Sequence, residues 1–271
     1  PALATHWTIS ADGLTYRFDL RQAVTIQDGT PFNAAAVKYT FERMLDDKHP
    51  AHNTGPFPLS FFFSSIKSIE VVDEHTVVFH LKEPFAPLLS NLATPTGLIV
   101  SPTAVAKYGK DFGRHPVGTG AFRFGEWQAN QRVVVTANSD YWDGKPAIQN
   151  VVFRPITDNN TRVAEMLSGG IDAMPEVPPD TVKLFAEKPN RFRLYQTTGP
   201  HVWYVMLNTR SAPFNDVRVR QAVNYAINKP SLVDNILQGS ADVATGPIPS
   251  AFSWAYNNDV KPYPYDPQKA R

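Results

Sequence analysis

Apolar residues along the chain follow two different periods, and the alternation between these periods constrains the fold more than any other feature. In residues 15–21, Tyr16, Phe18 and Leu20 alternate with charged residues, which is the period of a half-buried strand. Beyond a turn at residues 28–31 the period becomes helical, carried by Val37, Phe41, Met44 and Leu45. Asn33 stands where a helix N-cap is expected. A strand, a turn and a helix in this order indicate an α/β protein.

The segments that follow also predict alternating strands and helices. Residues 66–72 and 76–82 are rich in β-branched and aromatic residues and flank the polar triplet 73–75, which predicts a β-hairpin. A short helix is expected within residues 84–92. From Pro116 onward a second α/β unit is predicted, with strands at residues 122–127, 133–135, 150–156, 192–197 and 201–208. Helices are predicted at residues 159–167, with Asp158 as the cap, and at 181–187, and Asp216 opens a helical pair that pauses at Pro230 and ends at Leu237.

Composition excludes several classes of protein. With 271 residues and 42% hydrophobic content, the chain is too apolar to be disordered and is long enough for two cores. Its 26 Lys and Arg residues balance 25 Asp and Glu residues, and no window concentrates basic residues, so we expect no nucleic-acid partner. Every apolar run is far shorter than the roughly 20 residues that cross a bilayer.

The chain carries no recognisable catalytic motif. It has no cysteine, no Gly-x-Ser-x-Gly elbow and no phosphate-binding loop, and Gly118-Thr119-Gly120 lacks the third glycine of a dinucleotide fingerprint. Serine–histidine–aspartate catalysis on another scaffold stays open but has no support. Of the seven histidines only His49 and His52 lie close together, in a loop without a carboxylate cluster. We therefore expect neither an enzyme nor a cofactor nor a metal site.

Several ordered segments resemble the extracytoplasmic solute-binding proteins that serve dipeptide, oligopeptide, glutathione and nickel ABC importers. The segments with this resemblance are Trp7–Ser10, Asp12–Tyr16, Phe18–Arg21, Asp28–Ala34, Pro116–Gly120, Tyr141-Trp142, Ser168-Gly169 with Ile171-Asp172, Asn208-Thr209, Pro213-Phe214, Val219–Ala222, Tyr225–Asn228 and Tyr265–Pro267. Ala121 departs from the pattern, because relatives commonly place proline there, and Gly170 replaces a frequent acidic residue. Neither departure lies at an expected ligand position.

The resemblance implies an incomplete two-lobed fold of the type II periplasmic-binding-protein class, with an extra α/β subdomain. We expect that subdomain at residues 1–115, the main part of the N-terminal lobe at 116–203 and the start of the C-terminal lobe at 204–271. Such proteins are roughly twice as long, so a fragment is expected that lacks an N-terminal strand and most of the C-terminal lobe. An extracytoplasmic or periplasmic location, with or without a lipid anchor, and a monomer are implied as well.

The implied function is capture of a small peptide-like ligand for the membrane permease subunits of an ABC importer. The segment Thr94-Pro95-Thr96-Gly97 corresponds to a cleft-facing stretch of relatives, and its small hydroxyl groups suit a ligand; an ordinary Pro-Gly loop is the alternative. His201 and Trp203 are expected on one face of a strand near the lobe crossing, where a core tryptophan is the alternative. A nickel chelate or another small solute, or a sensor domain of a larger receptor or enzyme, are the alternative functions.

Overall fold

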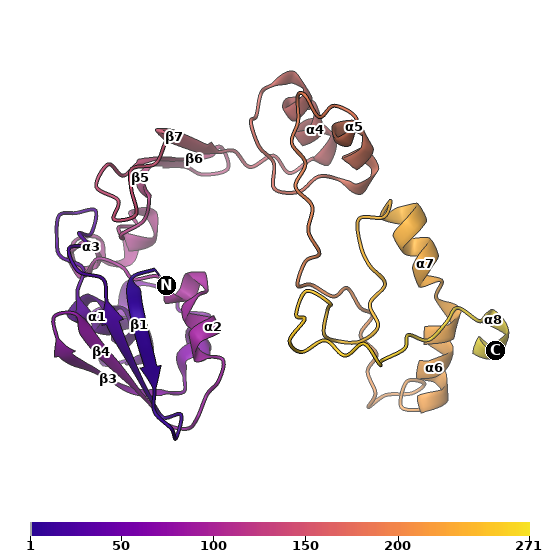
Figure 1. The fold of residues 1–271 in the computed structure, drawn as a ribbon, viewed down its shortest axis with the longest axis horizontal. Coiled ribbons are helices and arrows are strands. Elements are labelled where there is room, and N and C mark those ends of the chain that lie inside the picture. Colours follow the sequence, from indigo (N-terminus) through magenta and orange to yellow (C-terminus); the bar gives the residue numbers. More distant parts are fainter. Residues whose placement is uncertain (1) are drawn as a thin grey trace. The chain divides into compact units, whose positions relative to one another are not determined.

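The chain folds as two compact units, Pro1–Pro155 and Ile156–Arg271, in a computed structural model that describes residues 2–271 (Figure 1). The first unit contains, in chain order, β1 (Ala4–Ile9), β2 (Thr15–Leu20), α1 (Ala34–Leu45), η1 (His52–Thr54), η2 (Ser60–Phe63), β3 (Ile66–Asp73), β4 (Thr76–Leu81), α2 (Leu88–Leu92), η3 (Pro95–Gly97), α3 (Pro102–Tyr108), η4 (Gly109–Arg114), β5 (Phe122–Gln128), β6 (Arg132–Ala137) and β7 (Asn150–Phe153).

A four-stranded antiparallel sheet with the order β1-β2-β4-β3 forms the body of the first unit. Phe18 lies opposite Val77, and Tyr16 lies opposite Phe79, so the alternating apolar residues of β2 and β4 share one face. That face is buried, while charged residues such as Arg17 occupy the other. This is the hydrophobic-in, polar-out alternation of an antiparallel sheet with one solvated face.

Helix α1 covers the apolar face of this sheet. Asn33 caps it, because its side-chain oxygen accepts a hydrogen bond from the backbone N–H of Ala36 (3.0 Å). Phe41 is 1% exposed and makes edge-to-face contacts with Phe63 (5.0 Å) and Phe79 (5.2 Å). Burial of such aromatic side chains, with the aliphatic residues around them, stabilises this body.

A second, three-stranded sheet with the order β5-β6-β7 completes the first unit. Both of its pairings are antiparallel, with Phe124 opposite Val135 and Val134 opposite Val152. The predicted strands at residues 122–127 and 133–135 are thus confirmed with slightly wider bounds. The predicted strand at residues 150–156 forms but ends at Phe153.

The second unit is built from short helices joined by segments without regular secondary structure. It contains α4 (Asn159–Ser168), η5 (Pro179–Thr181), α5 (Val182–Ala186), α6 (Val217–Ala226), α7 (Lys229–Ser231), η6 (Leu232–Ile236) and α8 (Pro267–Ala270). Asp158 caps α4 and Asp216 caps α6, as the sequence predicts for helix starts. Arg218 binds the Asp216 carboxylate at 2.6 Å, and Arg220 donates to the carbonyl of Phe214 at 2.8 Å.

The predicted strands at residues 192–197 and 201–208 are wrong. Neither segment forms regular secondary structure, and among residues 156–271 no segment pairs as a strand. The apolar side chains of the second segment are open to solvent, with Trp203 88% and Met206 80% exposed. A β-strand forms only through hydrogen bonds to a neighbouring strand, and residues 156–271 contain no neighbouring strand.

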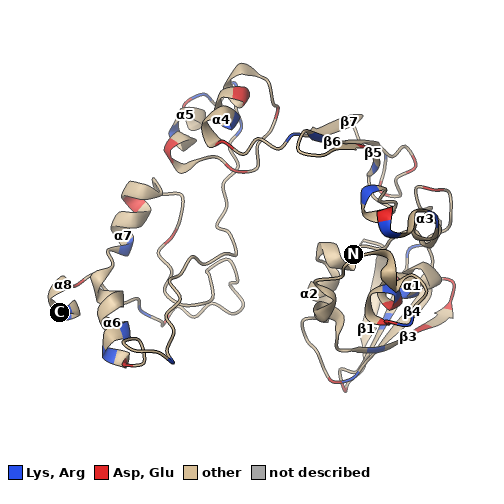
Figure 2. Cartoon of the chain, turned by 180° about the vertical axis from the view of Figure 1, so that it is seen from behind, with Lys and Arg blue, Asp and Glu red and all other residues tan. Residues whose placement is uncertain are grey.

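Charged residues of both signs are interspersed over the two units (Figure 2). Ion pairs between them lie at the surface, for example Arg17 with Asp19 and Lys38 with Glu42. Exposed pairs of this kind contribute little to stability. Within residues 2–271, none of the helices combines the length and the apolar character that a bilayer crossing requires.

Candidate functional site

The candidate ligand segment, residues 94–97, begins where α2 ends. Leu88 is fully buried and fixes α2 in the core of the first unit. The side-chain amide of Asn91 donates to the carbonyl of Phe62 (2.7 Å), and the Thr94 hydroxyl donates to the carbonyl of Asn91 (2.7 Å). Pro95 then starts the single turn η3, in which the N–H of Gly97 donates to the carbonyl of Thr94 (2.9 Å). The segment is therefore an ordered turn.

Gly97 is required by the closeness of this turn to α2. A Cβ atom built on Gly97 would lie 2.3 Å from the carbonyl oxygen of Leu92 and 2.8 Å from its carbonyl carbon. Both of these are backbone atoms, so no side-chain rotation would relieve the clash. Only glycine allows the turn to lie against the last turn of α2.

The segment offers hydroxyl and apolar groups to a ligand but no charge. Thr94 and Thr96 are half-buried and Pro95 is exposed. Among the described residues the Thr96 hydroxyl makes no hydrogen bond, so it is free to donate and to accept. Leu98, directly after the turn, is 67% exposed and adds apolar surface. Such groups suit binding of a small solute by hydrogen bonds and contact, and they provide no acid, base or nucleophile.

The residues after the turn are tied to three other segments. The N–H of Val100 donates to the hydroxyl of Thr40 in α1 (3.3 Å), and the N–H of Ser101 donates to the carbonyl of Val117 (3.0 Å). Ser101 is fully buried, and its hydroxyl donates to the carboxylate of Asp28. The same hydroxyl accepts from the N–H of Ala104 and so caps α3.

Asp28 is held as a carboxylate by its neighbours. Partial burial raises its pKa, but hydrogen bonds from the Ser101 hydroxyl and from the hydroxyl and N–H of Thr30 outweigh burial and leave the pKa below its ordinary value. The Asp28 carboxylate therefore stays ionised at neutral pH. It links the turn at residues 28–31 to the segment that follows residues 94–97.

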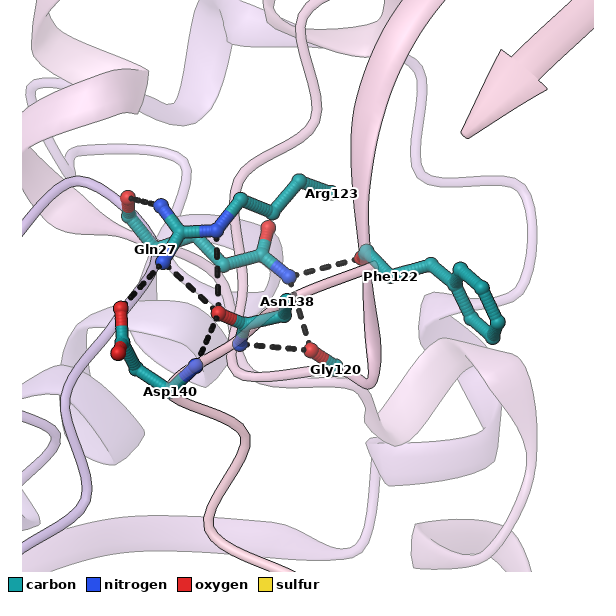
Figure 3. A network of polar contacts seen from close by, with 6 residues as sticks. All are labelled: Gln27, Gly120, Phe122, Arg123, Asn138 and Asp140. Carbon is teal, nitrogen blue, oxygen red and sulfur yellow. Dashed lines mark hydrogen bonds and ion pairs between the residues drawn. The ribbon is translucent and has the colours of Figure 1, made fainter. Parts of the chain in front are cut away.

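The turn that carries Asp28 is fixed to the second sheet by a polar network (Figure 3). The side-chain amide of Gln27 donates to the carbonyls of Gly120 (3.0 Å) and Phe122 (2.8 Å). In return, the carbonyl of Gln27 accepts from the guanidinium of Arg123 (2.8 Å). Three hydrogen bonds thus join Gln27 to the start of β5.

Asn138 organises the other side of this network (Figure 3). It is 2% exposed, and its side-chain oxygen accepts from Arg123 Nε (3.0 Å) and Nη2 (2.8 Å), while its amide donates to Gly120 (3.1 Å). Asp140 binds the same guanidinium at 3.1 Å. Every polar atom of the Asn138 side chain has a partner, which is the condition for burying it at low cost.

Sequence patterns alone do not predict these supporting residues. In the sequence, Asp28 is recognisable only as part of a turn, and Gly118 and Gly120 only as flexible positions of the backbone. The contacts span long separations, since Asp28 meets Ser101 across 73 positions and Gln27 meets Phe122 across 95. Local periodicity carries no information on such pairs.

The remaining predicted ligand residues, His201 and Trp203, belong to the second unit, whereas Thr94, Pro95, Thr96 and Gly97 belong to the first. His201 is exposed and Trp203 is 88% exposed, in a segment that is neither helix nor strand. The expected shared strand face therefore does not exist in the described residues, and neither does the core position considered for Trp203. Within residues 2–271, no cluster of three or more His, Asp or Glu side chains fits a metal ion.

Comparison with known proteins matches the whole chain, residues 1–271, to the middle part of the bacterial extracellular solute-binding proteins, family 5. The glutathione-binding protein GsiB of Escherichia coli O157:H7 is 39% identical over 270 residues, which are 99% of this chain and 51% of that protein. The GsiB of Salmonella typhi is 40% identical over 272 residues, again 51% of its length. The chain thus spans about half the length of the curated relatives it matches.

Solved structures share the fold. The periplasmic binding protein DppA from Helicobacter pylori, in complex with the peptide STSA, is 34% identical with a TM-score of 0.87, over 100% of this chain and 56% of DppA. NikZ from Campylobacter jejuni, in complex with Ni(L-His), is 31% identical with a TM-score of 0.83, over 100% of this chain and 53% of NikZ. These structures confirm the predicted periplasmic-binding-protein fold class. The chain belongs to the bacterial extracellular solute-binding proteins of family 5.

Proposed function

We propose that the full-length protein captures a small peptide-like solute, namely a dipeptide, an oligopeptide or glutathione, between two lobes and delivers it to the permease subunits of an ABC importer. The observation that carries this proposal is the likeness of 99% of the chain to glutathione-binding proteins. The high TM-score to a DppA with bound peptide supports the same ligand class. The protein acts as a binding protein, as a monomer and without a cofactor.

In the full-length protein, binding would use hydrogen bonds and contact area from the predicted ligand residues. Residues 94–97 would contribute the free Thr96 hydroxyl on a turn that is already ordered, so little ordering cost is added. The exposed side chains of His201 and Trp203 would lose solvent contact on closure around the ligand. A micromolar ligand corresponds to about 8 kcal/mol, which a few charge-assisted hydrogen bonds of roughly 1.5 to 3 kcal/mol each, with apolar burial, supply.

Lobe closure is the step that would turn binding into transport. In a hinged protein, a ligand that contacts both lobes shifts the population toward the closed state by its differential affinity for that state. Residues 1–115 and 116–203 are proposed as the two parts of the N-terminal lobe, and 204–271 as the start of the C-terminal lobe. The permease would recognise the closed form.

A nickel chelate is the second candidate ligand, favoured by the TM-score of 0.83 to a NikZ that holds Ni(L-His). The two candidates separate in a thermal-shift assay on the full-length protein with glutathione, the dipeptide Met-Leu and Ni(L-His) as probes. A ligand at about 100 times its Kd adds roughly 2.7 kcal/mol of stability. We expect shifts with glutathione or Met-Leu; a shift with Ni(L-His) alone would reject the peptide class.

The role of the ligand segment is tested by Thr96→Val in the full-length protein. This change removes the free hydroxyl and keeps the shape, so the Kd for the bound probe should rise by about three- to tenfold. Thr103→Val is the matched control, because Thr103 is an exposed threonine on α3. Equal Kd values for both variants would exclude Thr96 from the site.

A further inference from the structure

Asp28 lies outside residues 94–97 and is hydrogen-bonded to Ser101 in the stretch of chain that follows them. Its carboxylate accepts hydrogen bonds from two places: the hydroxyl of Ser101, and the N–H (3.1 Å) and hydroxyl (2.6 Å) of Thr30 within its own turn. Among the described residues it is the one charged group that binds the stretch between η3 and α3. The turn that contains Asp28 is itself fixed to the second sheet by the hydrogen bonds of Gln27.

Ser101 transmits this restraint over a short length of chain. Only residues 98–100 separate it from Gly97, and a chain of this length spans little more than ~14 Å even when fully extended. Ser101 is fully buried, so its hydroxyl has no water to replace the carboxylate if that partner is lost. We expect a shift of Ser101 to reach the turn at residues 94–97, which lies close to the backbone of Leu92.

We propose that Asp28 is a positioning residue for the ligand segment: through Ser101 it holds residues 94–97 in the binding geometry and so sets the affinity for the solute. This inference rests on the proposed function, since it takes residues 94–97 as a ligand contact. The energetic basis is preorganisation, because a segment that is already ordered loses less entropy when the ligand arrives.

The test compares Asp28→Asn with Asp12→Asn in the full-length protein. Asp12 has the same local chemistry, because it accepts from the Ser10 hydroxyl (2.5 Å) and from the N–H of Leu14 (3.0 Å), but its turn joins β1 to β2. Asparagine at position 28 has a single side-chain oxygen. If that oxygen still accepts from Thr30, an NH2 group takes the place of the Oδ2 atom that accepts from Ser101, and an NH2 group accepts no hydrogen bond. Thr30→Val is a second control, which weakens the turn and keeps the Ser101 contact.

Two readouts decide the outcome. We expect Asp28→Asn to raise the Kd for glutathione about tenfold, while Asp12→Asn and Thr30→Val change it by less than about twofold. In the ligand-free protein, Asp28→Asn should also speed amide hydrogen exchange at Gly97, Leu98 and Val100, whose N–H groups are hydrogen-bonded, by about tenfold or more. The controls should leave these amides unchanged.

The two readouts also separate this inference from the proposed function. If exchange at residues 97–100 is the same in Asp28→Asn and the wild type, Asp28 does not position the segment and the inference is overturned. If exchange speeds up but the Kd for glutathione stays constant, the control of affinity is overturned. If the wild type binds neither glutathione nor Met-Leu, the proposed ligand class fails, and exchange alone then decides the positioning role.

Discussion

The two units of the molecule differ in how their apolar residues are used. Within residues 2–271, all but two of the buried hydrophobic residues lie in the first unit, and the exceptions are Val163 and Phe185. The second unit instead leaves aromatic side chains in solvent, including Trp203 at 88% and Trp254 at 85% exposure. An apolar residue stabilises a fold only when neighbours remove it from water. Apolar content thus indicates where a core is possible, whereas the partners decide whether it forms.

The largest expected effect tests this difference directly. In the chain of residues 1–271, Phe41→Ala empties a site that is 1% exposed and packed against Phe63 and Phe79, and it should cost about 3 to 5 kcal/mol of unfolding free energy. Trp203→Ala removes an even larger side chain, yet its exposure predicts a change within about 0.5 kcal/mol. Denaturant unfolding measures both variants, and a comparable loss in the second would refute the contrast.

A second test uses polar groups. Asn138→Ala removes the acceptor of two hydrogen bonds from the Arg123 guanidinium at a buried position, so we expect a loss of about 2 to 3 kcal/mol. Asn224→Ala in α6 of the second unit removes one hydrogen bond, to the carbonyl of Arg220 (3.1 Å), from a half-buried side chain. Because alanine is also the better helix former, this change should be close to neutral in the same unfolding experiment.

The third test concerns backbone packing at the ligand segment. Gly97→Ala places a Cβ against the backbone of Leu92 and should cost about 1 to 3 kcal/mol by overpacking. Gly113→Ala in η4 is the matched control, because a Cβ there meets no atom within 4 Å. Thermal unfolding of the two variants gives the comparison, and an unchanged Tm for Gly97→Ala would show that the turn moves away from α2 without cost.

Local sequence patterns predict the elements that need only their own residues or a near neighbour. The helix capped by Asn33, the hairpin of β3 and β4 and the helix capped by Asp216 form as expected. Family membership, the fold class and an extracytoplasmic location were predicted from ordered motifs and are confirmed by the comparisons. The strands expected at 192–197 and 201–208 fail because periodicity describes a strand but not its partner.

Residues 94–97 also have some features that the sequence predicts and others that only the fold reveals. The sequence singles out Thr94, Pro95, Thr96 and Gly97, and their ligand role stays a prediction. The reason for the glycine is visible only in the fold, since Leu92 is five positions away and the clash depends on the turn between them. The residues that support the segment from a distance, such as Asp28 and Asn138, require contacts across 73 and 18 positions. No local pattern encodes such pairs, because the fold itself brings them together.

The smallest expected effect is a difference in pH dependence between the helix caps of the two units. Asn33 caps α1 with a neutral amide, whereas Asp216 caps α6 with a carboxylate whose pKa is lowered from 3.8 to about 2, first by hydrogen bonds from the side chain and N–H of Arg218. Since this folded-state pKa lies below the ordinary value, the ionised cap stabilises folded α6 fully above pH about 4. That contribution falls away as the pH drops from about 4 through about 2.

An NMR titration of the amide protons of Ala36 and Arg218 measures this difference. Each amide donates to the cap residue of its own helix. We expect the Arg218 amide to shift with a midpoint near pH 2, and the Ala36 amide to show no step there, because an asparagine side chain does not titrate. Asp216→Asn should abolish the Arg218 step. A midpoint near 3.8 would mean that Arg218 does not hold the carboxylate in solution, and α6 would then be capped no differently from a helix with a free aspartate.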